Sequence, residues 1–582
     1  MSSISGKTFD IPLLKRVMKY VRPYRITFLS TAIFAIALAF LSPVRPMLIQ
    51  YAFDNYILTP NIDMLFQITL ILISLLVVES VMQFFYIYWA NWLGQSVIRD
   101  LRMQVYNHIL NFKQKYFDNT PIGTLVTRVV SDIETIADIF SQGLLVIIGD
   151  ILKLLVVLAV MFATDWRLTL FSLASIPILL LATYWFKRSI KSAFQEVRTQ
   201  VSALNTFVQE RIVGMRIIQL FNREKVEFEN FKAINQLHKK AHVRSIWYYS
   251  IFFPIVEILS AISIGLLIWW GGVEAATGTE VTLGELVAFI LYIQMLFRPI
   301  RQLADRFNIL QMGMVASERV FRILDTDEVI ENKGSVQADK IKGDIEFKNV
   351  WFAYNDEDWV LKDVSFSVKA GQTLALVGAT GSGKSSIINL LSRNYNHDKG
   401  EVLIDGVNYL DYELSSLRSK MSLVLQDVFL FSDTILNNIT LFKKISFNKV
   451  IESAKKIHID SFIENLPESY NYNVKERGAM LSVGQRQLIS FLRAYVSDPS
   501  ILILDEATSN IDSDSEKMIQ KAIVELTQAR TSIVIAHRLA TIQNADQILL
   551  LKDGKILESG THQELMKRGG QYKILFDLQF QE

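Results

Sequence analysis

Apolar residues in the first half of the chain gather into six long runs. The runs lie near residues 26–49, 64–88, 142–163, 168–186, 250–271 and 283–300. An α-helix needs roughly 20 apolar residues to cross about 30 Å of hydrocarbon, and each run approaches or exceeds that length. The pattern therefore predicts six transmembrane helices. An even number of spans brings both ends of this region to the same side of the membrane.

Two of the intervening segments, 89–141 and 187–249, are too long to be simple turns. They mix apolar and charged residues at helical spacing, so the spans are expected to continue as helices beyond the membrane. Asp, Asn, Pro and Gly cluster between Phe117 and Gly123, which predicts a turn there. A second turn is expected near 214–224.

The pattern changes after residue 325. A polar segment at 326–344 is followed by short apolar runs that alternate with helical patterns over 345–582. Alternating strands and helices are typical of an α/β domain. The chain is thus expected to consist of a membrane domain at 1–325, a linker at 326–344 and an α/β domain at 345–582.

Positive charge is distributed unevenly about the spans. The basic residues before the first span are Lys7, Lys15, Arg16, Lys19, Arg22 and Arg25. Residues 187–244 hold twelve Lys or Arg, whereas the opposite loops, near 55–63, 164–167 and 272–281, hold only Arg167. Because Lys and Arg stay preferentially on the cytoplasmic side, both termini are expected in the cytoplasm. The predicted location is the inner (plasma) membrane, with several crossings.

Composition removes several function classes. The net charge of +2 offers no polyelectrolyte argument for nucleic acid, which is not expected as a partner. The chain has no cysteine, so disulfides and thiolate catalysis are excluded. The N-terminus is basic and amphipathic, which favours a helix along the inner leaflet over a signal peptide. Its apolar face would hold Ile11, Leu14, Val17, Met18 and Val21.

The first candidate site in the α/β domain is a phosphate-binding motif. Gly378-x-x-x-x-Gly383-Lys384-Ser385 follows an apolar strand, 374–377, and precedes a predicted helix, 385–393. In this context backbone N–H groups surround the β- and γ-phosphates of a nucleotide, Lys384 adds a positive charge and Ser385 ligates Mg²⁺. The residues expected to contact the nucleotide here are Gly378, Thr380, Gly381, Ser382, Gly383, Lys384, Ser385 and Ser386.

A pair of carboxylates follows a second apolar strand, 501–504. Asp505 and Glu506 stand at its carboxyl end, where α/β sheets bind their ligands. Asp505 is expected to hold the hydrated Mg²⁺, and Glu506 to polarise the attacking water as general base. A pair of solvated strand-end carboxylates is the alternative interpretation, which the upstream phosphate loop makes the weaker one.

Further segments complete an ordered set. They are Gln426 to Ser432, Glu476-Arg477-Gly478, Leu481-Ser482-Val483-Gly484-Gln485, His537 and Gly560-Thr561-His562. With the phosphate loop and the carboxylates, this set resembles the ATP-binding cassette transporters, and the whole chain resembles an exporter half-transporter. In the membrane half, Phe117-Asp118, Thr120 to Gly123 with Arg128 and Asp132, and Phe221 to Glu224 resemble the family's coupling regions.

The resemblance implies a fold and a set of roles. The fold is an α-helical six-span membrane domain joined to an α/β P-loop nucleotide-binding domain with a helical subdomain. Tyr354 would stack on adenine, with Trp351 and Phe352 as rivals and a core aromatic as the alternative. Gln426 would sense the γ-phosphate and ligate Mg²⁺, together with Ser385 and Asp505. His537 would contact the γ-phosphate, and the cofactors are ATP and Mg²⁺.

A dimer follows from the resemblance, because each ATP would lie between one phosphate loop and the signature of a second subunit. Ser482, Gly484 and Gln485 would contact the partner's nucleotide, at the N-terminus of a helix expected after Gln485. A homodimer is favoured, since the hydrolytic residues are all present and two-fold homodimers are the commonest assemblies. A heterodimer stays open, because Val483 and Asn510 depart from the family's usual Leu-Ser-Gly-Gly-Gln and Ser-Ala-Leu-Asp.

The expected activity is ATP-driven export of amphipathic or lipid-like small molecules by alternating access, from the cytoplasm or the inner leaflet. Membrane lipids are expected partners. Four ionisable residues fall within the predicted spans and are candidates for the transport path; they are Glu79, Asp150, Lys153 and Glu257. An ATP-gated pore or ligand-sensing assembly is the alternative, and a soluble ATPase would not need the six apolar runs.

Overall fold

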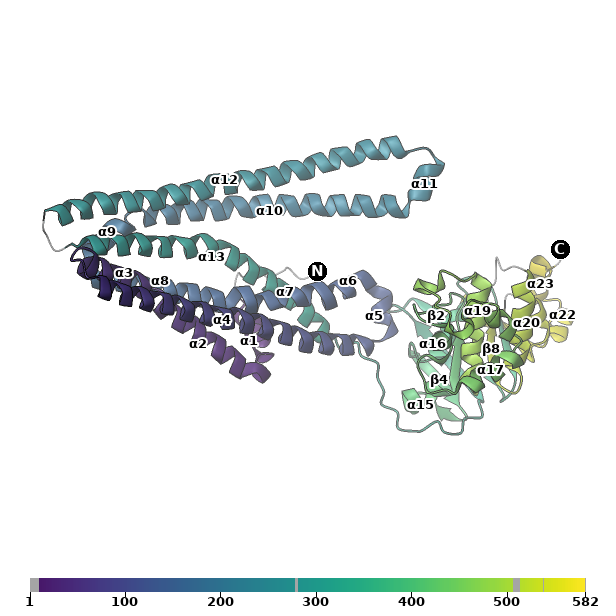
Figure 1. Ribbon diagram of the computed structural model, residues 1–582. Helices are drawn as coiled ribbons and strands as arrows, with labels where there is room; N and C mark the ends of the chain where they lie inside the picture. Colours follow the sequence, from purple (N-terminus) through teal and green to yellow (C-terminus); the bar gives the residue numbers. More distant parts are fainter. Residues whose placement is uncertain (1–9, 278–280, 506–512, 537–538, 581–582) are drawn as a thin grey trace. The chain divides into compact units, whose positions relative to one another are not determined.

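The computed structural model describes residues 10–277, 281–505, 513–536 and 539–580 (Figure 1). It divides into two compact units. The first contains residues 1–110 and 122–326, and the second contains residues 111–121 and 327–582. The short segment 111–121, which sequence reasoning placed within the membrane domain, groups with the second unit.

The first unit is helical throughout its described length. Its helices are α1 (Ile11–Lys19), α2 (Arg25–Leu41), α3 (Val44–Ala52), α4 (Ile62–Leu110), α6 (Ile122–Thr127), α7 (Ile133–Asp138), α8 (Leu144–Thr164), α9 (Trp166–Leu173), α10 (Ile176–Val213), α11 (Met215–Leu220), α12 (Glu224–Ala276) and α13 (Leu283–Leu324). Short 3-10 or π-helical segments join several of them, as at η1 (Arg22–Tyr24), η2 (Phe53–Ile57), η3 (Arg128–Asp132) and η4 (Ile139–Gly143).

Among the residues that the structure describes, five helical stretches are long and apolar enough to cross a membrane. They are Arg22–Ile57, Ile62–Leu110, Ile122–Thr164, Trp166–Val213 and Glu224–Ala276. The first five predicted spans fall within these stretches, so the helical transmembrane domain is confirmed. The sixth predicted span coincides with the first part of α13, which is a continuous helix of 42 residues.

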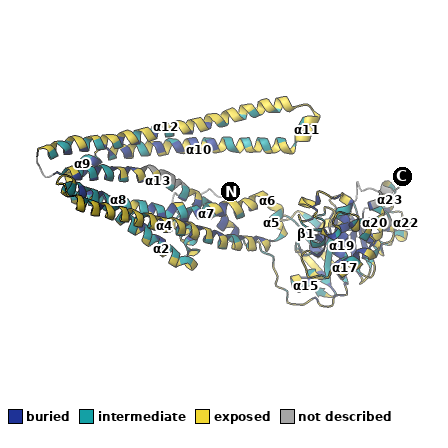
Figure 2. Cartoon of the chain, in the orientation of Figure 1, coloured by how far each residue is buried: buried dark blue, intermediate teal, exposed yellow. Residues whose placement is uncertain are grey.

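The helices α10 and α12 run side by side over most of their length, with α11 at the turn between them (Figure 1). This turn coincides with the predicted one near 214–224. The part of the pair near α11 is largely exposed (Figure 2), and it includes the apolar side chains of Val213, Leu220 and Phe221. Long helices that expose apolar residues outside a span are typical of an interface that the single chain leaves open.

The second unit contains two sheets. The strands are β1 (Ile345–Ala353), β2 (Trp359–Val368), β3 (Thr373–Val377), β4 (Lys399–Ile404), β5 (Val407–Asn408), β6 (Met421–Val424), β7 (Ile501–Asp505), β8 (Thr531–Ile535), β9 (Gln547–Lys552) and β10 (Lys555–Gly560). An antiparallel sheet has the order β2-β1-β4-β5. The larger sheet has the order β10-β9-β3-β8-β7-β6, and only β10 runs antiparallel to its neighbour. The predicted α/β organisation is therefore correct.

The second unit also contains helices, several of which build a second core next to the larger sheet. They are α5 (Gln114–Asn119), α14 (Lys384–Leu391), α15 (Leu414–Ser419), α16 (Ile435–Thr440), α17 (Phe447–Lys456), α18 (Asp460–Glu464), α19 (Val483–Val496), α20 (Ser513–Thr527), α21 (Leu539–Gln543), α22 (His562–Arg568) and α23 (Gln571–Phe580). Apolar side chains of α16 to α19 pack together and against the far side of β6 and β7. Helices α16 to α19 thus share a core that also includes residues of the sheet and of α20, and the helical subdomain that the resemblance implied stays a prediction.

Candidate functional site

Four adjacent parallel strands bring the predicted site residues to one edge of the larger sheet. The strands β3, β8, β7 and β6 are hydrogen-bonded neighbours in this order. At its carboxyl end β3 leads into the phosphate loop, and β8 leads into the segment before His537. Strand β7 ends at Asp505, and β6 ends shortly before Gln426. Ligands of parallel α/β sheets bind at this edge. The ends of β3 at Val377 and of β8 at Ile535 thus meet at this edge because of strand order alone.

The phosphate loop has the backbone geometry that its glycines permit. Gly383 caps α14 with a φ of 105°, a conformation that side chains rarely adopt. A Cβ atom on Gly378 would lie 2.3 Å from the carbonyl oxygen of Leu551 on β9. The helix begins at Lys384, one residue before its predicted start. Its first backbone N–H groups therefore border the loop, as an anion site requires.

The Lys384 side chain lies within this loop. Its Nζ donates to the carbonyl oxygens of Gly378 at 2.8 Å and Ala379 at 2.9 Å, and the residue is only 8% exposed. Burial lowers the pKa of this ammonium, and the carboxylate of Asp505 opposes that shift. A polyphosphate bound here would supply the negative charge that a buried cation lacks.

Another buried polar atom fits the same ligand. The Oγ of Ser382 is inaccessible to solvent and has no hydrogen-bond partner among the described residues. An unpaired buried hydroxyl is costly unless a ligand or water satisfies it. Thr380 and Ser385 are exposed at the loop surface, so their hydroxyls are accessible to a nucleotide or to a metal ion.

The carboxylate segment is described up to Asp505, which ends β7 and interacts electrostatically with Lys384. The predicted general base, Glu506, and the predicted γ-phosphate contact, His537, lie outside the described residues, as does Asn510. Gln426 follows β6 after one residue and is exposed. The strand ends thus agree with the predicted placement, and the roles of these side chains stay predictions.

Tyr354 follows β1 and is fixed against the helix of the phosphate loop. Its hydroxyl lies 3.1 Å from the Oγ of Ser386 and accepts from the Nδ2 of Asn389 at 3.0 Å. The rival Phe352 is 2% exposed and belongs to the core. The rival Trp351 packs edge-on against Trp359. Tyr354 is the one of these three aromatic residues that is hydrogen-bonded to α14.

The signature segment forms the N-terminus of α19. Ser482 is the N-cap residue, and its hydroxyl accepts from the backbone N–H of Gln485 at 3.2 Å. The Gln485 side chain accepts in return from the Ser482 N–H at 2.9 Å. The helix begins at Val483, not after Gln485 as expected, because this reciprocal capping starts it earlier. Val483 is 51% exposed, so its side chain meets no steric conflict within the chain.

Sequence reasoning missed one contact of the turn predicted between Phe117 and Gly123. The Tyr395 hydroxyl donates a short hydrogen bond to Asp118 on α5. The Tyr395 ring meets the Tyr354 ring edge-on at 5.0 Å. Burial, together with Asp118, raises the pKa of Tyr395, so the hydroxyl stays a proton donor at neutral pH. No motif marked Tyr395, because its partner lies far away in sequence.

Two other residues of the predicted coupling regions are paired with each other. Arg128 donates to Asp132 in a salt bridge one helical turn apart, and Arg319 of α13 approaches the same carboxylate at 3.7 Å. Asp132 is buried. A buried carboxylate with two guanidinium partners holds its surroundings in one arrangement, so these residues connect η3 to α13.

The charged residues within the predicted spans form a mixed cluster. Arg45 of α3 approaches Glu79 of α4 at 4.0 Å, and Lys153 of α8 interacts electrostatically with Glu79 and Asp150. The Asp150 Oδ2 is buried without a hydrogen-bond partner among the described residues. Glu257 is exposed and has an interaction of its own. Three of the four candidates are therefore close in space and partly neutralise one another.

Comparisons with known proteins cover both units. The ABC transporter transmembrane region matches residues 28–300, and the ABC transporter family matches residues 361–509. An uncharacterized ABC transporter ATP-binding protein of Bacillus subtilis, YknV, is 38% identical over 581 residues, 99% of this chain and 96% of the relative. An ATP-dependent lipid A-core flippase of Pseudoalteromonas translucida is 35% identical over 98% of each chain.

A third relative is YgaD of Bacillus subtilis, whose name makes it a candidate multidrug export ATP-binding/permease protein. It is 35% identical over 97% of this chain and 99% of its own length. Matches of this extent span the membrane unit and the nucleotide-binding unit together. The chain therefore belongs to the ABC transporter family, as an exporter-type half-transporter that fuses a membrane domain to an ATPase coupled to transport.

Proposed function

We propose that this chain exports amphipathic or lipid-like small molecules from the cytoplasm or the inner leaflet. The proposal rests on one observation: a single chain combines an ATP-binding sheet edge with a helical membrane domain that contains a partly buried cluster of charged residues. Relatives named for lipid A-core flipping and multidrug export support this substrate class. A pore that ATP merely gates would not need a hydrolytic Glu506 and His537.

The proposed hydrolytic site uses residues from four strand ends. Mg²⁺, when bound, neutralises phosphate charge, and Ser385, Gln426 and Asp505 would hold it. Lys384 and the amides at the start of α14 would bind the phosphates, and Tyr354 the adenine. Glu506 would accept a proton from the attacking water, while His537 would contact the γ-phosphate.

The proposed membrane topology has six spans, with the first part of α13 as the sixth. Both termini and the nucleotide-binding domain would face the cytoplasm, in the inner (plasma) membrane. The Lys and Arg residues of 187–244 lie on α10, α11 and α12 and in the short connection at Arg223, which supports this orientation. In linear order, we propose a membrane domain at 1–325, a linker at 326–344 and a nucleotide-binding domain at 345–582.

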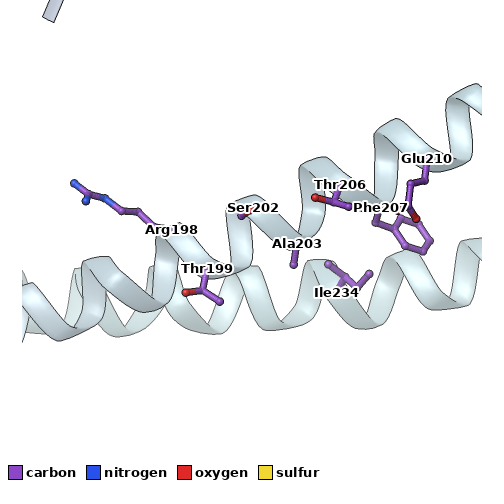
Figure 3. A pocket seen from close by; sticks show the side chains of 8 residues that line it. All are labelled: Arg198, Thr199, Ser202, Ala203, Thr206, Phe207, Glu210 and Ile234. Atoms are coloured by element: carbon purple, nitrogen blue, oxygen red, sulfur yellow. The ribbon is translucent and has the colours of Figure 1, made fainter. Parts of the chain in front are cut away.

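The proposed assembly is a homodimer, and a heterodimer is the second possibility. A groove of about 710 Å³ lies along α10 and faces Ile234 of α12 (Figure 3). It mixes apolar residues such as Ala203 with the charged Arg198 and Glu210. Exposed apolar residues near α11 extend this unpartnered surface. In such a dimer, the resemblance implies that Ser482, Gly484 and Gln485 of one subunit would contact the nucleotide of the other.

Directional transport in sealed inside-out vesicles tests the proposed function. Vesicles that contain the chain should accumulate a fluorescent amphipathic drug or labelled lipid when ATP is added, and should not do so with a non-hydrolysable analogue. Accumulation with that analogue, or movement in both directions down a gradient, would favour an ATP-gated pore.

The homodimer predicts complementation between two defective chains. Lys384→Ala and Ser482→Arg are each expected to abolish hydrolysis when alone. In a mixed dimer both lesions fall in one composite site, so the other site stays intact and some hydrolysis returns. The measurement is ATPase activity of co-purified, differently tagged chains. If the purified wild-type chain is a monomer without ATPase activity until a different subunit is added, the heterodimer is correct.

The Asp118–Tyr395 contact predicts a coupling defect. Tyr395→Phe removes the hydroxyl but keeps the ring against Tyr354, so ATP affinity should change less than about threefold, a small effect in free energy. Drug uptake per ATP hydrolysed should fall about tenfold, the scale of one charge-assisted hydrogen bond. Uptake and hydrolysis are measured in the same vesicles. Tyr472→Phe, next to the core that α16 to α19 share, is the matched control, and an unchanged ratio for Tyr395→Phe would refute the assignment.

A further inference from the structure

The N-terminal helix α1 has two dissimilar faces. Asp10 caps its start by accepting from the backbone N–H of Leu13 at 3.1 Å, and Pro12 occupies the first turn. On one face Val17 and, just after the helix, Val21 are 1% and 4% exposed, so they anchor the segment to the membrane unit. Ile11, at the other end of the predicted apolar face, is exposed, and the position of this helix along the inner leaflet stays a prediction.

The other face forms a basic groove. It has a volume of about 560 Å³ and is lined by Pro12, Lys15, Arg16, Lys19 and Tyr20. Lys15 and Lys19 are exposed and lie one helical turn apart, so their ammonium groups share one side. Within the described part of the chain, neither lysine side chain has a hydrogen bond or an ion pair. Two cations are thus held close together with no acidic partner.

The wall of this groove is fixed by contacts with α13 and α4. Arg16 donates to both carboxylate oxygens of Asp325 at 2.7 and 2.6 Å, and its guanidinium lies 4.2 Å from the centre of the Phe321 ring. Tyr20 stacks on the same ring and donates to Gln104 at 2.6 Å. Because Asp325 is already engaged by Arg16, it does not neutralise the two lysines. The groove therefore needs little reorganisation to bind an anion.

The groove stands at the edge of the first candidate span. This span begins at Arg22, three residues after Lys19, and Arg22 and Arg25 are exposed as well. Between residues 10 and 25 the only acidic residue is Asp10. Basic clusters next to a span attract anionic lipids, and an amphipathic helix lies at the depth of their headgroups.

We propose that the groove on α1 binds the phosphate headgroup of an anionic phospholipid, held by Lys15 and Lys19 beside the fixed Arg16. The acyl chains of this lipid would lie along the exposed apolar residues Ile26 and Leu29 at the start of α2. Through Arg16 the bound headgroup adjoins Asp325, the C-cap residue of α13. The lipid site thus borders the joint between the membrane domain and the chain that leads to the ATPase. The proposed topology determines only which leaflet of the membrane contains this lipid; the binding site itself does not depend on it.

Native mass spectrometry of the full chain tests this proposal. The delipidated protein is titrated with phosphatidylglycerol or with phosphatidylcholine of the same acyl chains, without nucleotide. The wild type should retain phosphatidylglycerol preferentially. Lys15→Gln/Lys19→Gln should weaken that binding about tenfold or more, because each basic residue near an anionic lipid contributes roughly a fivefold factor. Lys15→Arg/Lys19→Arg should retain it.

A matched control distinguishes lipid binding at this site from a general effect of positive charge on the protein. Lys239→Gln/Lys240→Gln removes two exposed charges from α12, away from the groove, and should leave lipid binding unchanged. Equal losses in both pairs, equal retention of the two lipids, or displacement by millimolar glycerol phosphate would overturn the proposal. Since binding is measured without ATP, a failure here is independent of the vesicle uptake that tests export.

Discussion

Glu506→Gln is expected to lower the ATP turnover of the purified chain at least about a hundredfold, the scale of losing a general base. The substitution keeps the size of the side chain but removes its ability to accept a proton from water. Mg-ATP should still bind, because Lys384, the amides of α14 and Asp505 are unchanged. Steady-state hydrolysis and equilibrium nucleotide binding, measured on the same preparation in lipid, check both halves of this expectation.

The matched control is Glu452→Gln, which changes an exposed carboxylate on α17 away from the sheet edge. It should hydrolyse ATP at the wild-type rate. Turnover near wild type in Glu506→Gln would move the general base to another residue. Loss of nucleotide binding together with turnover would instead assign Glu506 a structural or metal-holding role.

Lys384→Met is expected to abolish tight ATP binding. The substitution preserves most of the aliphatic stem in the phosphate loop, but it removes the cation that lies nearest to the polyphosphate. Two charge-assisted hydrogen bonds at roughly 1.5 kcal/mol or more each correspond to at least about a hundredfold loss of affinity. Binding of a fluorescent ATP analogue, with and without Mg²⁺, measures this loss.

A structural control accompanies that experiment, because Lys384 also donates to the carbonyl oxygens of Gly378 and Ala379. The thermal unfolding of Lys384→Met without nucleotide should stay close to that of the wild type, while its stabilisation by ATP disappears. Lys369→Met, at an exposed position after β2, should bind ATP normally. Unchanged affinity in Lys384→Met would refute the phosphate-loop assignment.

Local pattern was sufficient for those parts of the chain whose structure depends on near neighbours. Apolar length predicted the spans, since a bilayer imposes the same requirement on any helix that crosses it. The phosphate loop was predictable because it needs particular residues at consecutive positions. The reciprocal capping of Ser482 and Gln485 explains why α19 begins at Val483. Both residues belong to the signature motif, although the motif led us to expect a later helix start.

Contacts between distant segments were not predictable in the same way. Asp118 was noted as part of a turn, but its partner Tyr395 is 277 positions away and carries no motif. The grouping of 111–121 with the second unit depends on such contacts, including a bridge between Phe112 and Val329. Likewise, Arg16 and Asp325 are 309 positions apart, and neither alone suggests a groove.

The sequence by itself determined five apolar spans, and it supplied the expected orientation and the residues proposed to bind and hydrolyse ATP. These properties follow from local composition and from short motifs. A bilayer requires one continuous apolar stretch, and a phosphate loop requires particular residues at neighbouring positions. Only the tertiary structure decided which strands are neighbours. The order β3-β8-β7-β6 brings Lys384 and Asp505 to one edge, and packing across helices frees Lys15 and Lys19 while it engages Arg16. Such arrangements depend on contacts between segments far apart in sequence, where the choice among alternative pairings is made by the whole fold.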